Sequence, residues 1–378
     1  METTALMWLI FQMTHSVEMN ALMLILRAAP MVIFALIGGI VADRFNRRLV
    51  LICALAASVV FSSTLAVFVH LGMIQPWHLL LYSAITGVTT SFNHPARSSL
   101  LPNIVRKEHY LNAITMDNVS VTGSRILGAT LGGVIIGFAG TTPVLGLRAA
   151  GALLAMVWII MIRPQETPTE AKKATPWHNL MEGLQYVGKH KEVLTQVLLY
   201  LLPIFVSNSY TSLLPYFSQE VLHIGPDLYG LLNAASGIGA ILVTFFIAGF
   251  KDFSRMRSVL IFGGLAQGLA LVAFAVSPNF VIAFFVLVFI GGAGNIFMTL
   301  NNTIIQQLIT DQVRGRVMSL REVSFGLGPV GSLIPSALAT SPAGFTLAML
   351  VAGGITLVVF VAIKLAVPQR SPDISKGN

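Results

Sequence analysis

Charged side chains are scarce within the long apolar stretches of this chain, and the few that occur there could do chemistry. Arg97 and Asp117 lie ten residues before and ten residues after Lys107. If Lys107 marks a turn between two antiparallel helices, both side chains lie about 15 Å from that turn and can pair. A carboxylate in such a place can carry a proton, because burial and a charged neighbour tune its protonation. A fixed structural ion pair is equally compatible with this spacing.

A few other charged residues lie in or next to the apolar stretches. Glu322, at the start of one stretch, is the second candidate proton carrier. Arg27 and Arg125 lie 18 to 19 residues from the nearest basic turns, and such deep cations should face a cavity or another helix rather than lipid. They suit an anionic or catecholate-like ligand, whereas a backbone carbonyl or Glu18 is the alternative partner. Arg148, near the end of its stretch, is expected to extend toward water.

Amide side chains gather in one apolar stretch, at Asn295, Asn301, Asn302, Gln306 and Gln307. Asn295 and Asn302 are seven residues apart, which places them on nearly the same face of a helix. They can line a substrate cavity or hydrogen-bond a neighbouring helix, and the second role is favoured.

The composition identifies lipid as the solvent of the elements that carry these residues. Of 378 residues, 55% are hydrophobic and only 10% are charged, with a mean hydropathy of +0.80. A soluble domain carries about 25% charged residues. The single cysteine excludes a disulfide framework, and the sequence predicts no catalytic residues, no metal site and no cofactor. A phosphate-binding Gly-x-x-x-x-Gly-Lys-Ser/Thr loop is missing from the sequence, which argues against an ATP-driven pump.

Eleven apolar stretches are long enough to cross the ~30 Å bilayer core as helices. They are predicted at 21–41, 49–71, 77–101, 113–139, 143–162, 193–217, 228–250, 259–277, 281–309, 317–339 and 345–367. A shorter stretch, 4–14, spans only about 16 Å as a helix. We interpret it as the second half of a first span whose other half precedes Met1, with a re-entrant helix as the alternative.

Basic residues segregate to alternate loops. Of the 23 lysines and arginines, 19 lie in one set of loops and the C-terminal tail, and the opposite loops hold none. The positive-inside rule places the basic set, and with it the C-terminus, in the cytoplasm. This placement also explains a pI near 9.8 without a nucleic-acid partner.

An internal repeat divides the chain. Residues 91–106 align with residues 299–314 at a shift of 208, and Gly123 and Gly331 keep that shift. The repeat predicts an all-α membrane protein of two six-helix bundles related by pseudo-two-fold symmetry, with a site between the halves. The predicted domains are 1–163, a cytoplasmic connector at 164–192 with an amphipathic helix, 193–368, and a tail at 369–378.

One turn carries a family signature. Gly39 is followed by Asp43, Arg44, Arg47 and Arg48, which resembles the Gly-x-x-x-Asp-Arg-x-Gly-Arg-Arg motif of the major facilitator superfamily. Asn46 replaces the last glycine of the motif, and asparagine is expected to tolerate the same left-handed turn. The resemblance implies that this turn, above all Asp43, gates the cytoplasmic side by bridging to the other half near the start of the stretch 317–339. The alternative is that its charges only satisfy the positive-inside rule.

Residues 92–97 and 111–114 resemble the enterobactin-exporter-like branch of bacterial drug and siderophore exporters. Residues 125–133 resemble the antiporter signature of the fifth span, with Ala129 in place of its proline. The resemblance implies a monomeric proton-coupled antiporter in the bacterial inner membrane that exports an amphipathic small molecule. An uptake symporter of the same fold and an inactive truncated fragment are the alternatives. A membrane-embedded enzyme is disfavoured because His94 and His109, near the cytoplasmic face, have no second histidine or carboxylate at metal-ligand spacing.

Overall fold

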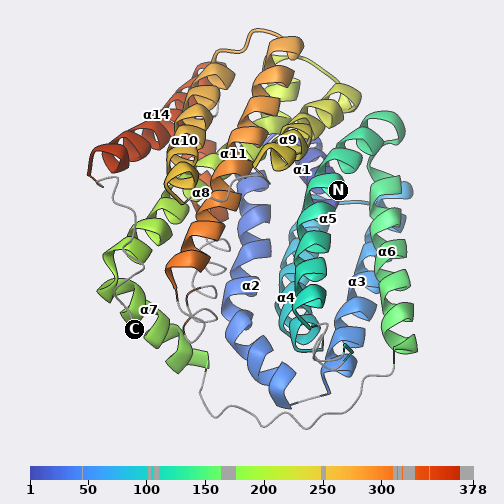
Figure 1. Ribbon diagram of the computed structural model, residues 1–378. Coiled ribbons are helices and arrows are strands. Elements are labelled where there is room, and N and C mark those ends of the chain that lie inside the picture. Colours follow the sequence, from blue (N-terminus) through green and yellow to red (C-terminus); the bar gives the residue numbers. More distant parts are fainter. Residues whose placement is uncertain are drawn as a thin grey trace. The chain divides into compact units, whose positions relative to one another are not determined.

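The computed structural model describes residues 1–44, 46–100, 104–105, 110–162, 176–247, 253–309, 313, 317, 328–339 and 341–366. Every regular element within these ranges is a helix. Figure 1 gives their order, and the first eight are α1 (Glu2–Thr14), α2 (Val17–Arg44), α3 (Arg47–His70), α4 (Pro76–Leu100), α5 (Tyr110–Ala139), α6 (Thr141–Met161), α7 (Pro176–Lys189) and α8 (Lys191–Tyr216). They are followed by the π-helix η3 (Phe217–Val221), α9 (Pro226–Ile247), α10 (Phe253–Ala275), α11 (Phe280–Leu308), the 3₁₀ helix η4 (Gly328–Ser332), α13 (Leu333–Leu338) and α14 (Pro342–Ala366).

The helices coincide with the predicted spans, and α1 coincides with the short first stretch. Within the described residues, six helical segments are both long and apolar enough to cross a membrane, in α3, α6, α9, α10, α11 and α14. The helices α2, α4, α5 and α8 have 28, 25, 30 and 26 residues, so each also exceeds the ~30 Å bilayer core at about 1.5 Å per residue. Of the predicted span 317–339, residues 318–327 lie outside the described residues, and the described part contains η4 and α13.

By their contacts the residues fall into two compact units. Unit 1 comprises Met1–Glu182 and Ser212–Ala234, and unit 2 comprises Gly183–Thr211 and Ala235–Asn378. The end of α8 and the first part of α9 therefore belong with the N-terminal helices. The same helix contacts recur in both units: α3 packs against α4 and α6, and α10 packs against α11 and α14. The 208-residue repeat aligns these helices, so the helix packing within each unit follows the repeat.

Helix α1 supplies the core of unit 1. Leu6, Met7 and Ile10 are almost completely buried and pack with Leu79 of α4 and Leu145 of α6. Because α1 is apolar around its whole circumference, it can be enclosed by other helices on every side. A polar residue on α1 therefore has to find its partners inside the bundle.

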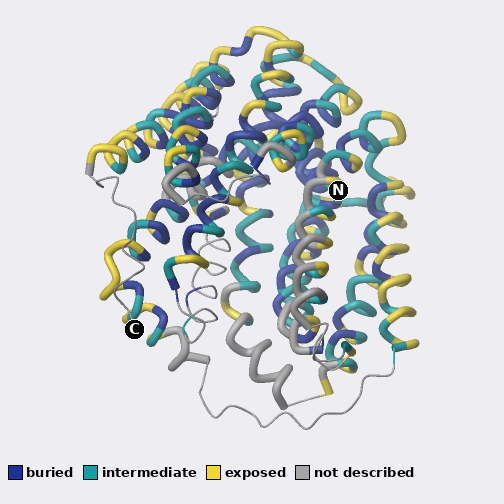
Figure 2. Tube along the Cα trace, viewed as in Figure 1, coloured by how far each residue is buried: buried dark blue, intermediate teal, exposed yellow. Residues whose placement is uncertain are grey.

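The outer helices present apolar side chains outward. Figure 2 shows exposed residues recurring along α6 and α14. On α6, Leu147, Leu154, Trp158 and Met161 are all exposed and follow one another at helical spacing. An exposed apolar stripe of this length on a spanning helix is expected where lipid, rather than water, is the solvent.

Candidate functional site

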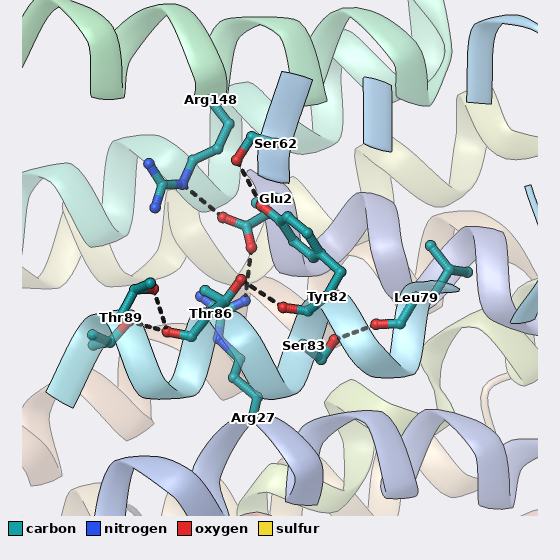
Figure 3. Close-up of polar contacts among 10 residues, drawn as sticks. Glu2, Arg27, Ser62, Leu79, Tyr82, Ser83, Thr86, Thr89 and Arg148 are labelled. Atoms are coloured by element: carbon teal, nitrogen blue, oxygen red, sulfur yellow. Dashed lines mark hydrogen bonds and ion pairs between the residues drawn. The ribbon is translucent and has the colours of Figure 1, made fainter. Parts of the chain in front are cut away.

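The most deeply buried charged side chain among the described residues is Glu2, in the first turn of α1, with 6% exposure. Arg27 of α2 donates from Nη1 to Glu2 Oε1 at 3.1 Å. Arg148 of α6 donates from Nε to Glu2 Oε2 at 2.7 Å. Figure 3 shows the two guanidinium groups approaching the carboxylate from opposite sides. Three helices thus place two cations and one anion in a shared cluster.

Neighbouring residues on α4 support this cluster. A Cβ atom on Gly87 would lie 2.2 Å from the carbonyl oxygen of Arg27, so only glycine permits this approach of α4 to α2. Tyr82 lies five residues earlier on α4. Its hydroxyl shares a 2.8 Å hydrogen bond with the hydroxyl of Ser62 on α3. Thr86 Oγ1 donates to the carbonyl oxygen of Tyr82 at 2.8 Å (Figure 3). The Tyr82 hydroxyl is thus paired with Ser62, and the hydrogen bonds to the Glu2 carboxylate come from the two arginines.

Contacts with the start of α9, which belongs to the same unit, hold α1 in place. Trp8 stacks on Tyr229 with ring centroids 4.5 Å apart. The Tyr229 hydroxyl donates to the carbonyl oxygen of Thr4 at 3.2 Å, and Thr4 Oγ1 donates to Asn233 Oδ1 at 3.3 Å. These contacts fix α1 along its axis and in rotation, which determines where Glu2 points.

Helices α5 and α9 approach each other more closely than side chains would allow. A Cβ atom on Gly133 would lie 2.1 Å from the carbonyl oxygen of Gly230, and one on Gly230 would lie 1.9 Å from the carbonyl oxygen of Gly133. Gly137 meets the backbone of Asp227 in the same way, at 2.7 Å. Small residues at a membrane helix interface permit direct backbone contact. Gly133 lies in the stretch that resembles the antiporter signature, and this contact is a physical reason for a glycine there.

A second ion pair joins α4 and α5. Arg97 Nη2 contacts Asp117 Oδ1, as the equal depth of the two residues predicts. The Arg97 and Asp117 side chains are 43% and 31% exposed, so the Asp117 carboxylate is less buried than that of Glu2, which is 6% exposed.

The basic turn between α2 and α3 shows a local arrangement that the sequence did not predict. Asn46 has φ −59° and ψ 110°, so the expected left-handed conformation is wrong. Its Oδ1 instead caps α3 by accepting from the backbone N–H groups of Arg48 and Leu49, at 3.0 and 3.3 Å. Asparagine suits this position because an N-cap needs a side-chain acceptor. Arg48 donates from Nε to the carbonyl oxygen of Ile159 at 3.1 Å and from Nη2 to that of Ile160, in the last turn of α6.

The two predicted amides of α11, Asn295 and Asn302, differ in their partners. Asn295 Nδ2 on α11 donates to the carbonyl oxygen of Ala240 and to Thr244 Oγ1 on α9, both at 2.9 Å. Asn302 Oδ1 accepts from Gln306 on its own helix at 3.4 Å. The Asn295 contacts join two helices, which is the role that the sequence favours for these amides.

Comparison with known proteins agrees with an all-helical membrane fold that contains few charged residues. The family model described as transmembrane secretion effector, a branch of the major facilitator superfamily, matches residues 1–376. The chain belongs to this family. Its members are transporters of small molecules rather than enzymes, so the predicted superfamily and the absence of an enzymatic role are confirmed.

The chain is similar to two named bacterial transporters and to a solved transporter structure. It is 22% identical over 332 residues to a staphyloferrin A transporter of Staphylococcus aureus, which covers 87% of this chain and 83% of the relative. It is 22% identical over 377 residues to the enterobactin exporter EntS of Shigella boydii, which covers 97% and 89%. Among solved structures, a bacterial homologue of human lysosomal Spinster, in an inward-facing and occupied conformation, has the same fold, with a TM-score of 0.74, 15% identity and coverage of 96% and 92%.

The structure describes some of the predicted site residues and not others. Arg27 contacts another helix as expected, but its partner is Glu2, whereas Glu18 accepts from Ser16. The expectation that Arg148 extends toward water is wrong, because this guanidinium turns inward to Glu2. The burial of Gly39, the side chains of Asp43, Arg44, Arg47 and Arg125, and all of Glu322 lie outside what the structure describes.

Glu2 was not among the candidates predicted from the sequence, because it lies outside the full-length apolar stretches. The available signal was a carboxylate directly before the apolar stretch 4–14. Its partners lie 25 and 146 residues away along the chain, so helix geometry alone could not assign them.

Proposed function

We propose that this protein is a secondary active transporter that exports amphipathic small molecules, of drug or siderophore type, by alternating access. Proton antiport drives the export, and the protein works as a monomer in the bacterial inner membrane with its C-terminus in the cytoplasm. The name of the relative that matches 97% of this chain, an enterobactin exporter, supports the direction and the substrate class.

The observation that carries the coupling mechanism is the ion pair between Arg97 and Asp117. It joins two long helices, and both side chains remain partly exposed, so a proton can reach the carboxylate. Protonation removes the negative charge and with it the attraction to Arg97, which frees α4 and α5 to change their contact. An ion pair that breaks in this way converts proton binding into helix movement.

The turn at 39–48 serves as the cytoplasmic gate in this proposal. Asp43 is the acidic residue of a basic turn, so the positive-inside rule does not account for it. A carboxylate is stabilised at a helix N-terminus by the unpaired N–H groups, which suits a contact that forms and releases as the transporter cycles.

Transport in proteoliposomes tests the proposal. The purified protein is reconstituted, a fluorescent amphiphile such as rhodamine 6G is loaded, and an imposed proton gradient is collapsed midway with an uncoupler. Antiport predicts gradient-driven movement of the dye against its concentration, which stops on collapse. Movement indifferent to the gradient contradicts antiport, and movement in the same direction as the protons supports the uptake symporter instead.

The variant Asp117→Asn tests the assigned carboxylate. We expect it to abolish gradient-driven transport while downhill exchange of dye continues, because only the proton step needs the acid. Glu192→Gln, which removes one exposed carboxylate in the first turn of α8, is the matched control and should transport normally. Gradient-driven transport by Asp117→Asn at the control rate would remove Asp117 from the mechanism.

A further inference from the structure

The Glu2 cluster contains more positive charge than its carboxylate can neutralise. Glu2 carries one negative charge, and Arg27 and Arg148 carry one positive charge each. The three side chains therefore have a net charge of +1. Arg148 lies within one of the apolar spanning segments, α6, where an uncompensated charge is costly.

The two guanidinium groups also have hydrogen-bond donors to spare. A guanidinium presents five N–H donors in a planar fork. Among the described residues, Arg27 and Arg148 each give one of these donors to Glu2. Their side chains are 31% and 33% exposed, whereas Glu2 is 6% exposed. The carboxylate is enclosed, and parts of both guanidinium groups remain accessible.

A purely structural ion pair would not need this composition. One arginine suffices to satisfy a buried carboxylate, and a second, partly buried arginine adds desolvation cost without a counter-charge. In membrane helices, charged residues of this kind most often mark the path of a substrate or an ion. The cluster therefore has the charge and the donors for one further anion.

We propose that Arg27 and Arg148 form a binding site for a carboxylate group of the transported molecule, with Glu2 as the fixed counter-charge that holds both arginines in place. The identification of this ligand as the transported molecule rests on the proposed function, whereas the anion site itself does not. A carboxylate matches the planar donor pattern of a guanidinium, and one carboxylate balances the net charge of these three side chains. Glu2 then limits the affinity, because it competes with the ligand for the same donors.

This arrangement predicts effects of opposite sign for the anion and the cations of the cluster. Glu2→Gln raises the net charge to +2 and frees both guanidinium groups, so carboxylate binding tightens. Arg27→Gln and Arg148→Gln each lower the net charge to zero, so binding weakens. We expect changes of about tenfold in each direction, in the lower part of the range for hydrogen bonds to charged groups. The double variant Glu2→Gln/Arg148→Gln restores the net charge of +1 and should bind close to the wild-type level.

The test measures binding of N-dansylglycine, an aromatic carboxylate, against its uncharged methyl ester. Energy transfer from tryptophan to dansyl reports binding to the purified protein in lipid nanodiscs, and Trp8 lies on the same helix as Glu2. Lys364→Gln, which removes one exposed cation at the end of α14, is the matched control and should bind like wild type. Thermal unfolding of each variant verifies that it is folded, and the double variant keeps the test valid if one single variant is not.

Two binding results and one transport result overturn the proposal. The first is equal binding of N-dansylglycine and its ester to the wild-type protein. The second is weaker binding by Glu2→Gln as well as by the arginine variants, which is the result expected if the cluster only ties α1, α2 and α6 together. Transport of the ester in proteoliposomes without any preference for the carboxylate would leave the export function standing and remove this site. Selective carboxylate binding without transport of either probe would do the reverse.

Discussion

Replacing Gly133 by alanine should disrupt the contact between α5 and α9. The added Cβ would lie 2.1 Å from the carbonyl oxygen of Gly230, whereas non-bonded heavy atoms rest at about 3.5 Å or more. The two helices would have to separate by roughly the difference, about 1.4 Å. The neighbouring atom is backbone, so no side-chain rotation can relieve the overlap. Overpacking of this kind costs about 1–3 kcal/mol.

Gly123 provides the control on the same helix. A Cβ atom there would meet nothing within 4 Å, so Gly123→Ala adds the same methyl group without a clash. Both variants gain the same benefit of alanine over glycine in a helix, about 1 kcal/mol, and this benefit cancels in the comparison. The difference between the two variants therefore reports the α5–α9 contact alone.

The assay is the temperature at which the purified protein in nanodiscs loses its helical signal, together with transport of a fluorescent amphiphile. We expect Gly133→Ala to unfold at a lower temperature than Gly123→Ala and to transport more slowly. Gly230→Ala, whose Cβ would lie 1.9 Å from the carbonyl oxygen of Gly133, should repeat the defect. Equal stability and transport of Gly133→Ala and Gly123→Ala would refute the reasoning, because the helices would then have room for a side chain.

Two further predictions concern the turn between α2 and α3. Asn46→Ala removes the acceptor for two backbone N–H groups and should lower the free energy of unfolding by about 1 kcal/mol, whereas Asn46→Asp keeps an acceptor and should not; comparison of their thermal unfolding distinguishes these outcomes. Asp43→Asn should insert into the membrane normally, because the basic residues of the turn are unchanged, yet transport poorly; a normal transport rate in proteoliposomes would exclude a gating role for Asp43.

The positions of the helices were predictable because of the solvent. In lipid a spanning segment must satisfy all of its backbone hydrogen bonds internally, so a long apolar stretch can only be a helix. The expected span 49–71 is observed as α3, Arg47–His70, and the expected span 281–309 as α11, Phe280–Leu308. The ends differ by one or two residues, because caps such as Asn46 extend a helix beyond its apolar part.

The site residues were predictable only where chain geometry links them. Arg97 and Asp117 belong to consecutive helices, so their distances from the connecting turn determine their relative depth, and the two side chains meet. The cluster of Glu2, Arg27 and Arg148 joins α1, α2 and α6, which are not all consecutive. Which side chains meet there depends on the close approach of α2 to α4 at Gly87 and on the rotation of α1. Neither quantity follows from hydropathy or spacing.

The basic turn illustrates how a motif combines roles that only structure can separate. Arg48 donates to the last carbonyl groups of α6, which favours a cation there because those carbonyls have no partner within their helix. This contact lies wholly within unit 1 and needs nothing from the other half of the transporter. Substituting Arg48 would therefore damage the end of α6 as well as any gate, and its effect on transport could not be assigned to either. Asp43 lacks a topological role, so its substitution by asparagine is the change that isolates gating.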